Sequence, residues 1–142
     1  MPHEFHTKRR IEFADTDMAG IVHFARFFIF METAEHEFLR SLGTSVAAKL
    51  DNMQLGWPRL AASCEYLSPA KFEDVLDIRV TVARKGKKSM TYQFEFRRGE
   101  VLIACGQMSS VCCIVSAEGK LKSIPIPAFL AEQIQEAPEK LK

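Results

Sequence analysis

One long segment, about residues 23–42, constrains the fold of this chain more than any other feature. Apolar side chains recur along it at helical spacing, at Phe24, Phe27, Met31, Ala34, Phe38 and Leu42. Three further apolar residues over 28–30 make the apolar stripe wider than that of a surface helix. The segment therefore predicts a helix enclosed by another layer, with Gly43 as its natural stop.

After this helix the hydrophobic period changes to two. Residues 75–85 and 89–97 alternate apolar and polar side chains, which predicts half-buried strands. Hairpin turns are expected at 85–87 and 98–100. The other expected elements are strands over 5–13, 59–67 and 101–116, a connection over 44–58, a short helix over 127–135 and a frayed tail over about 136–142. This order predicts an α+β protein in which an antiparallel sheet with one dry face wraps a single helix.

Length and charge set further expectations. The 142 residues fit one domain, residues 1–142. Nineteen Lys and Arg against eighteen Asp and Glu give a net charge of +1, without a global field for nucleic acid or membrane. The longest apolar run, 27–31, is too short to span a bilayer, and the N-terminal residues lack a signal-peptide pattern. We therefore expect a cytoplasmic protein with neither nucleic acid nor membrane as partner.

The four cysteines lack metal-ligand spacing, and no metal site is expected. The favoured interpretation is that Cys64, Cys105, Cys112 and Cys113 are small buried apolar residues in a reducing compartment.

Candidate chemistry lies in the small-residue loop just before the helix, which carries Asp15 and Asp17. The first N–H groups of a helix lack internal partners and carry partial positive charge, so they can hold a developing oxyanion. A carboxylate beside them can act as nucleophile or activate water. Aspartate is also a common helix cap, and from these residues alone capping is the favoured interpretation.

A resemblance to a known family favours a catalytic role over capping for this loop. The chain resembles the signature of the 4-hydroxybenzoyl-CoA thioesterase family, Asp-x-Asp-x-x-Gly-(Ile/Val)-Val, in Asp15-Thr16-Asp17-Met18-Ala19-Gly20-Ile21-Val22. The likeness continues through residues 30–34, 66–76 and 88–89, so it covers most of the chain. It implies a hotdog fold with a five-stranded antiparallel sheet around one long helix. It also implies hydrolysis of acyl-CoA thioesters without metal or redox cofactor, in a homodimer or homotetramer.

The resemblance also assigns residues. It implies that Asp17 is the catalytic carboxylate, as nucleophile or general base, that Gly20 forms the turn, and that the backbone N–H of Phe24 polarises the thioester carbonyl. Many relatives have Tyr-His where this chain has His23-Phe24. This difference leaves the role of the side chain open, but it does not affect the role of the backbone N–H. His23 is either a proton shuttle or a partly exposed helix-start residue. Asp15 is expected to fix the loop.

Two carboxylates on the helix need separate explanations. Glu35 falls within the apolar arc, where a carboxylate is costly unless it is paired. We expect it in a subunit-interface ion pair or bonded to backbone. Glu32 lies at the edge of the arc and matches an acidic position of the family, which makes it a further site candidate.

A basic cluster crowds one hairpin, with Arg84, Lys85, Lys87 and Lys88 followed by Ser89. Such a run is usually a solvated turn. Coenzyme A, however, carries phosphates that need cationic partners, and the family commonly places the nucleotide near this hairpin. We expect these five residues to bind the phosphates of acyl-CoA.

Two other functions stay as alternatives. A hotdog hydratase or dehydratase needs a histidine paired with an acid, typically in Asp-x-Asn-Pro-x-His; here Asp17 and His23 are six residues apart without Asn-Pro. A non-catalytic acyl-thioester binding protein is the second. The acyl group, whether aromatic, dihydroxynaphthoyl or short to medium aliphatic, stays open, as does CoA against acyl carrier protein.

Overall fold

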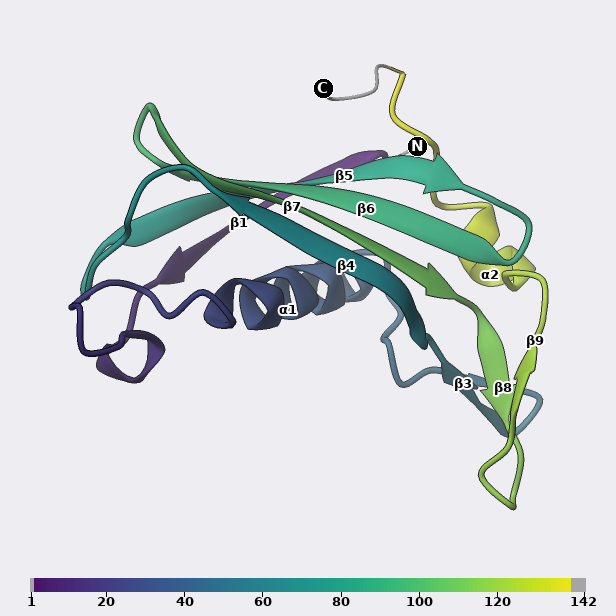
Figure 1. The fold of residues 1–142 in the computed structure, drawn as a ribbon. Coiled ribbons are helices and arrows are strands. Elements are labelled where there is room, and N and C mark those ends of the chain that lie inside the picture. The colour runs from purple at the N-terminus through teal and green to yellow at the C-terminus, as the bar shows by residue number, and fades with distance from the viewer. Residues whose placement is uncertain (1, 139–142) are drawn as a thin grey trace.

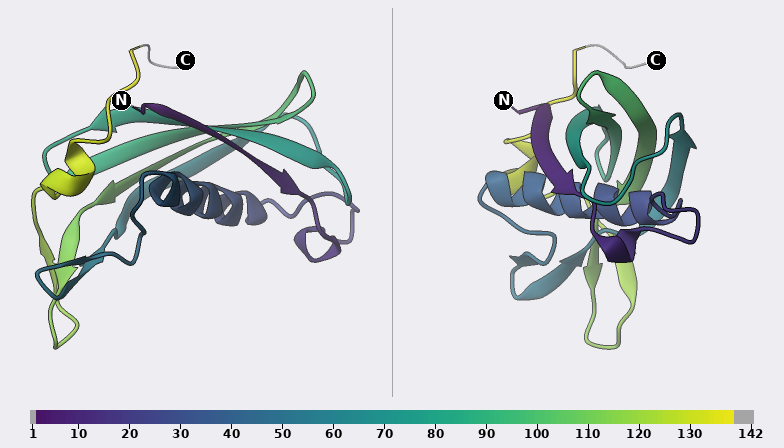
Figure 2. Two further views of the ribbon diagram at one scale, coloured as in Figure 1. Left: turned by 180° about the vertical axis from the view of Figure 1, so that it is seen from behind. Right: turned by 90° about the vertical axis from the view of Figure 1, so that its left-hand side faces the viewer.

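The computed structural model describes residues 2–138 and confirms the predicted α+β hotdog architecture. A curved antiparallel sheet arches over the long helix α1 (Arg26–Ser41) (Figure 1), and the view turned by 90° shows the strands curving above the helix (Figure 2). The strand order is β1-β5-β6-β7-β4. The strands are β1 (Glu4–Arg10), β4 (Arg59–Tyr66), β5 (Val75–Lys85), β6 (Ser89–Arg98) and β7 (Val101–Val111).

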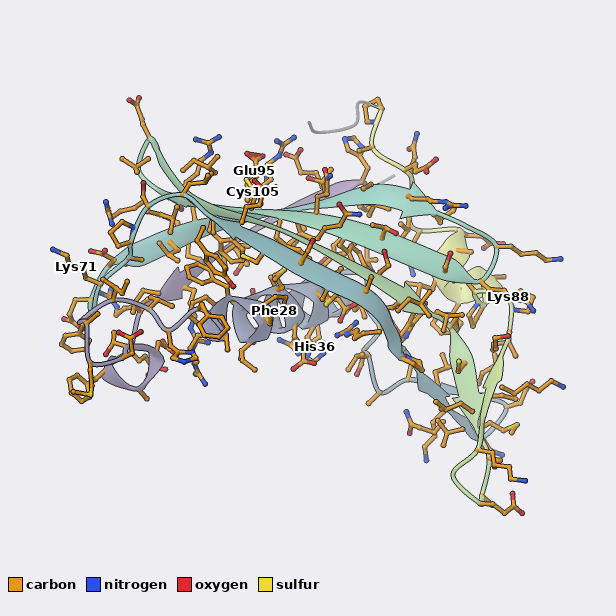
Figure 3. All side chains as sticks on the ribbon, viewed as in Figure 1. Phe28, His36, Lys71, Lys88, Glu95 and Cys105 are labelled. Atoms are coloured by element: carbon orange, nitrogen blue, oxygen red, sulfur yellow. The ribbon has the colours of Figure 1, made fainter. Side chains whose placement is uncertain are left out.

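The core lies between α1 and the concave face of the sheet. Alternate residues of β5 and β6 are buried there, as the period-two pattern predicts, namely Leu76, Ile78, Val80, Val82, Met90, Tyr92, Phe94 and Phe96. Opposite them, Phe27, Phe30 and Phe38 of α1 are buried. Gly106 of β7 faces the thioether of Met31, where a Cβ would collide with the sulfur, so this glycine lets the helix approach closely. Glu95 and Cys105 project from the opposite, convex face (Figure 3).

The sequence prediction missed a second sheet. Its strands are β2 (Lys49–Leu50), β3 (Met53–Gly56), β8 (Cys113–Val115) and β9 (Leu121–Ser123), in that order. The predicted connection over 44–58 therefore contains two strands, joined through left-handed residues Asp51 and Asn52. The predicted strand over 101–116 is also wrong in part, because it breaks at Cys112 and continues in the second sheet.

The chain ends differ from expectation as well. The last helix, α2 (Ala128–Ala131), is shorter than the predicted 127–135. Of the tail predicted to fray from about 136, the N–H of Ala137 donates to Val82 O at 2.8 Å, and residues 139–142 lie outside the described part. No helix within residues 2–138 is long and apolar enough to cross a membrane.

Candidate active site

The loop after β1 closes into a tight turn that presents Asp17. The N–H of Asp17 donates to Ile21 O at 3.0 Å, and that of Gly20 donates to Asp17 O at 2.9 Å. Gly20 has a φ of +79°, a left-handed conformation that glycine adopts without penalty. The exposed Asp17 carboxylate accepts the Ala19 N–H on Oδ1 at 2.9 Å, and within residues 2–138 nothing bonds its second oxygen. One carboxylate oxygen is therefore available for chemistry.

The start of α1 supplies the second element. The helix begins at Arg26, three residues later than predicted, because residues 23–25 form a turn. In that turn His23 O accepts the Arg26 N–H at 2.9 Å. Since the peptide bond between His23 and Phe24 is trans, the N–H of Phe24 points away from this bonded carbonyl. Among the described residues, the Phe24 N–H has no hydrogen-bond partner. It is a free donor beside the positive end of α1.

Neither aspartate caps α1, so the capping interpretation is wrong for this helix. Its N-cap is Ala25, without a side-chain hydrogen bond. The Asp17 carboxylate bonds within its own loop. The Asp15 carboxylate closes a capping box on the preceding short 3-10 turn (Phe13–Asp15) by accepting the N–H of Glu12 at 2.8 Å.

Asp17 and Phe24 line the same groove, which has a volume of about 560 Å³. The other lining residues are Ile21, Val22, Phe27, Tyr66, Leu67, Ser68, Pro69 and Ala70. The wall is mostly apolar, as in sites that bind an acyl group. Sequence reasoning assigned no role to Tyr66, although it stands in the motif over 66–76; its hydroxyl donates to Phe24 O at 3.0 Å.

Behind the loop, Asp15 is fully buried and paired with two arginines. Its Oδ1 accepts from Arg26 Nη2 at 2.6 Å and Nε at 2.9 Å, and Arg9 Nη2 lies at 3.4 Å. Burial by itself raises the pKa of Asp15. The Glu12 N–H and the two guanidinium groups outweigh burial and hold this pKa below its usual range. The geometry agrees with the prediction that Asp15 fixes the loop.

The structure places the other two candidates outside the groove lining. The exposed His23 ring stacks on Phe24, with ring centroids 4.7 Å apart, and its Nδ1 accepts the Ala25 N–H at 3.2 Å. No hydrogen bond joins His23 to Asp17 in the described residues. Glu32 lies on the second turn of α1, where its carboxylate is 3.5 Å from Arg59 Nη2.

Glu35 is 1% exposed, so the helical wheel placed it correctly. Its two oxygens accept from Arg59 at 2.7 and 2.8 Å, and Arg59 also donates to Ser110 Oγ at 2.9 Å. The prediction that Glu35 pairs across a subunit interface or bonds to backbone is therefore wrong, because its partner is Arg59 of the same chain. This ion pair links the middle of α1 to the outermost strand β4.

The basic hairpin lies far from Asp17 within one chain. Lys71, which pairs with Ile21 beside the Asp17 loop, and Lys88 stand at opposite ends of the sheet (Figure 3). Lys85 is engaged elsewhere, because its ammonium donates to two carbonyls near α2 at 2.8 Å each. The exposed cations of the hairpin are Arg84, Lys87 and Lys88, next to the half-buried Ser89.

The cysteines show no sign of activation. Cys112 and Cys113 are buried, and Cys64 and Cys105 are half-buried. Burial is the largest influence on Cys64 and raises the pKa of its thiol to about 11. This thiol is protonated at neutral pH and is therefore a poor nucleophile.

Asp17 and Phe24, whose N–H has no partner among residues 2–138, line one apolar groove of a hotdog fold, an arrangement that suits the class of hotdog thioester hydrolases. A model described as the thioesterase-like superfamily matches residues 11–134. The chain belongs to this superfamily.

Individual relatives support the same class. The chain is 25% identical over 118 residues to the acyl-CoA thioesterase YbgC of Haemophilus influenzae, covering 83% of this chain and 85% of the relative. It is 28% identical over 134 residues to a 1,4-dihydroxy-2-naphthoyl-CoA hydrolase of Thermosynechococcus vestitus, covering 93% and 89%. The solved structure of a gentisyl-coenzyme A thioesterase superposes with a TM-score of 0.79 at 30% identity, covering 89% of this chain and 99% of that one.

Proposed function

We propose that this protein hydrolyses acyl-CoA thioesters to the free acid and CoA, with Asp17 as the reacting carboxylate. One observation carries the proposal: Asp17 and Phe24 line the same apolar groove, and the Phe24 N–H has no hydrogen-bond partner among residues 2–138. The acyl group would lie against the apolar wall, with its carbonyl oxygen toward the Phe24 N–H. Charge that develops on that oxygen is then stabilised by the N–H and by the helix end.

Two routes fit this arrangement. As a nucleophile, the free oxygen of Asp17 attacks the thioester carbonyl, CoA leaves as the thiolate, and water hydrolyses the resulting mixed anhydride. As a general base, Asp17 takes a proton from water while that water attacks, and the proton passes to the departing sulfur. A burst of free thiol in the first turnover, equal to the enzyme concentration, indicates the nucleophilic route with a slow second step.

We also propose that the site is completed by a second copy. In residues 2–138, strand β4 pairs on one side only, with β7, and its Leu60 is 63% exposed. An open edge of this length favours pairing with another chain. Antiparallel pairing of two β4 strands reverses one subunit relative to the other. The partner's basic hairpin then lies at the same end as Asp17, so a homodimer, alone or as half of a homotetramer, would bring Arg84, Lys87 and Lys88 of the partner subunit toward the CoA phosphates.

Release of free thiol from a panel of acyl-CoA esters tests the proposal. The panel includes aromatic, dihydroxynaphthoyl and short to medium aliphatic groups, since two of the compared relatives are named for aromatic acyl esters. Acyl-carrier-protein thioesters of the same acids are assayed in parallel. Binding without thiol release would favour the non-catalytic alternative, and hydration of an enoyl ester would favour the hydratase.

A further inference from the structure

We propose that Arg26 is a positioning residue: through Asp15 it fixes the N–H of Phe24 relative to the carboxylate of Asp17. The inference rests on the proposed function, because it assigns how that site is held in place. Arg26 touches neither the groove lining nor Asp17 by any described hydrogen bond, so its effect passes through Asp15.

The placement of Arg26 is unfavourable for the helix itself. It is the first residue of α1, where the positive end of the helix dipole disfavours a cation. Its guanidinium compensates by holding Asp15 Oδ1 with two hydrogen bonds, at 2.6 and 2.9 Å. The acceptor is fully buried. A cation at this helix end therefore binds one buried carboxylate in the loop that precedes Asp17.

Asp15 connects this ion pair to both halves of the site. Its backbone carbonyl accepts the N–H of His23 at 2.9 Å, and His23 directly precedes Phe24. Along the chain it stands two residues before Asp17. The side chain of Asp15 is thus tied to the helix, its carbonyl to the segment with the free N–H, and its backbone to the loop with the carboxylate.

Loss of Arg26 would redirect Asp15 toward Arg9. The Nη2 of Arg9 is already 3.4 Å from the carboxylate, and the Nε of Arg9 is buried without a partner in the described residues. Arg9 belongs to β1 and lies over the Phe30 ring, 4.8 Å from its centroid. A carboxylate paired with Arg9 alone would shift toward the strand and away from the helix. A misplacement of about 1 Å is enough to cost up to about a hundredfold in rate.

The test compares Arg26→Gln and Arg26→Lys with a matched control. Arg79 likewise forms ion pairs, in its case with two carboxylates, Glu4 and Glu95. Its side chain is 37% exposed against 36% for Arg26, but it pairs across the convex face. We expect Arg26→Gln to lower kcat roughly tenfold to thirtyfold with KM changed less than about threefold. Arg26→Lys should recover part of the loss, since an ammonium reaches one oxygen but lacks the fork. Arg79→Gln should leave kcat unchanged.

Amide hydrogen exchange gives a readout that does not depend on activity. In Arg26→Gln the His23 N–H, which Asp15 O normally protects, should exchange about tenfold faster or more, while amides of β6 exchange as in the wild type. Unchanged exchange at His23, or a kcat loss no larger than that of Arg79→Gln, overturns the positioning role. If wild-type protein turns over no thioester but His23 exchange still rises, the segment is positioned by Arg26 and the proposed function is what fails.

Discussion

Replacing Asp17 by asparagine isolates the charge of the proposed catalytic group. The carboxylate is exposed and makes one hydrogen bond, from the Ala19 N–H at 2.9 Å, which the amide oxygen of asparagine can still accept. The fold should therefore lose less than about 1 kcal/mol. What disappears is the negative charge and the basicity of the free oxygen. We expect kcat to fall by roughly two to four orders of magnitude, or about 3–5 kcal/mol of transition-state stabilisation.

Asp15→Asn is the matched comparison, two residues away. It removes the charge of a buried group held by two arginines, so it should cost on the order of 3 kcal/mol of stability. Its effect on kcat should be about tenfold, as expected for a positioning role. Thiol release gives kcat and KM, and urea unfolding gives stability.

The outcomes separate clearly. If Asp17→Asn keeps near-normal turnover while Asp15→Asn abolishes it, the catalytic assignment is shifted by two residues. If neither substitution lowers turnover, the thioesterase mechanism itself is wrong.

Three further predictions follow from the same geometry. In Gly20→Ala the added Cβ meets no neighbouring atom, but alanine is forced to a φ of +79°, which should cost about 1–2 kcal/mol of stability. The substitution should also lower kcat, because it moves Asp17. Gly119→Ala, at a φ of +81° with equally open space, should lose similar stability in urea unfolding with kcat unchanged. Replacing Lys87 and Lys88 together by alanine should raise KM for CoA esters more than it lowers kcat, and the rise in KM should be smaller for thioesters that lack the nucleotide. An unchanged KM would mean that the basic cluster is only a solvated turn. Because the pKa of Asp15 is lowered by folding, its stabilisation is fully present above the ordinary value of 3.8 and is lost as pH falls below that value through the lowered pKa of the folded state. Urea unfolding from pH 7 to 3 should therefore show a larger loss of stability in the wild type than in Asp15→Asn.

Repeating patterns in the sequence predicted the fold well, because each pattern shows which face of a helix or strand is buried. Alternation over 75–85 and 89–97 gave β5 and β6 to within a residue at each end. Helical spacing gave α1 but misplaced its start, since Phe24 continues the apolar spacing through a turn that is not helical. The break at Cys112 was hidden because the residues on both sides are apolar, and no local signal marks a strand that changes sheets.

Only the part of the candidate site that lies in the family motif could be predicted from the sequence. The motif assigned expected roles to Asp17, Gly20 and the N–H of Phe24, whereas the chain's own spacing could not show that the Phe24 N–H has no partner among residues 2–138. The partners in the ion pairs could not be predicted from the sequence either. Glu35 and Arg59 are 24 residues apart and lie on different elements, so only the register of β4 against α1 brings them together.

That pair leads to a last prediction about stability. Arg59→Ala leaves the carboxylate of Glu35 buried at 1% exposure without its two hydrogen bonds, which at such sites costs about 3–5 kcal/mol. Replacing both residues, as Glu35→Leu with Arg59→Met, should recover most of the loss, because no uncompensated charge remains. Urea unfolding of Glu35→Leu, Arg59→Met and the double variant measures the coupling. A cost below about 1 kcal/mol for Arg59→Ala would mean that water reaches Glu35 and that the pair does not hold the edge strand to the helix.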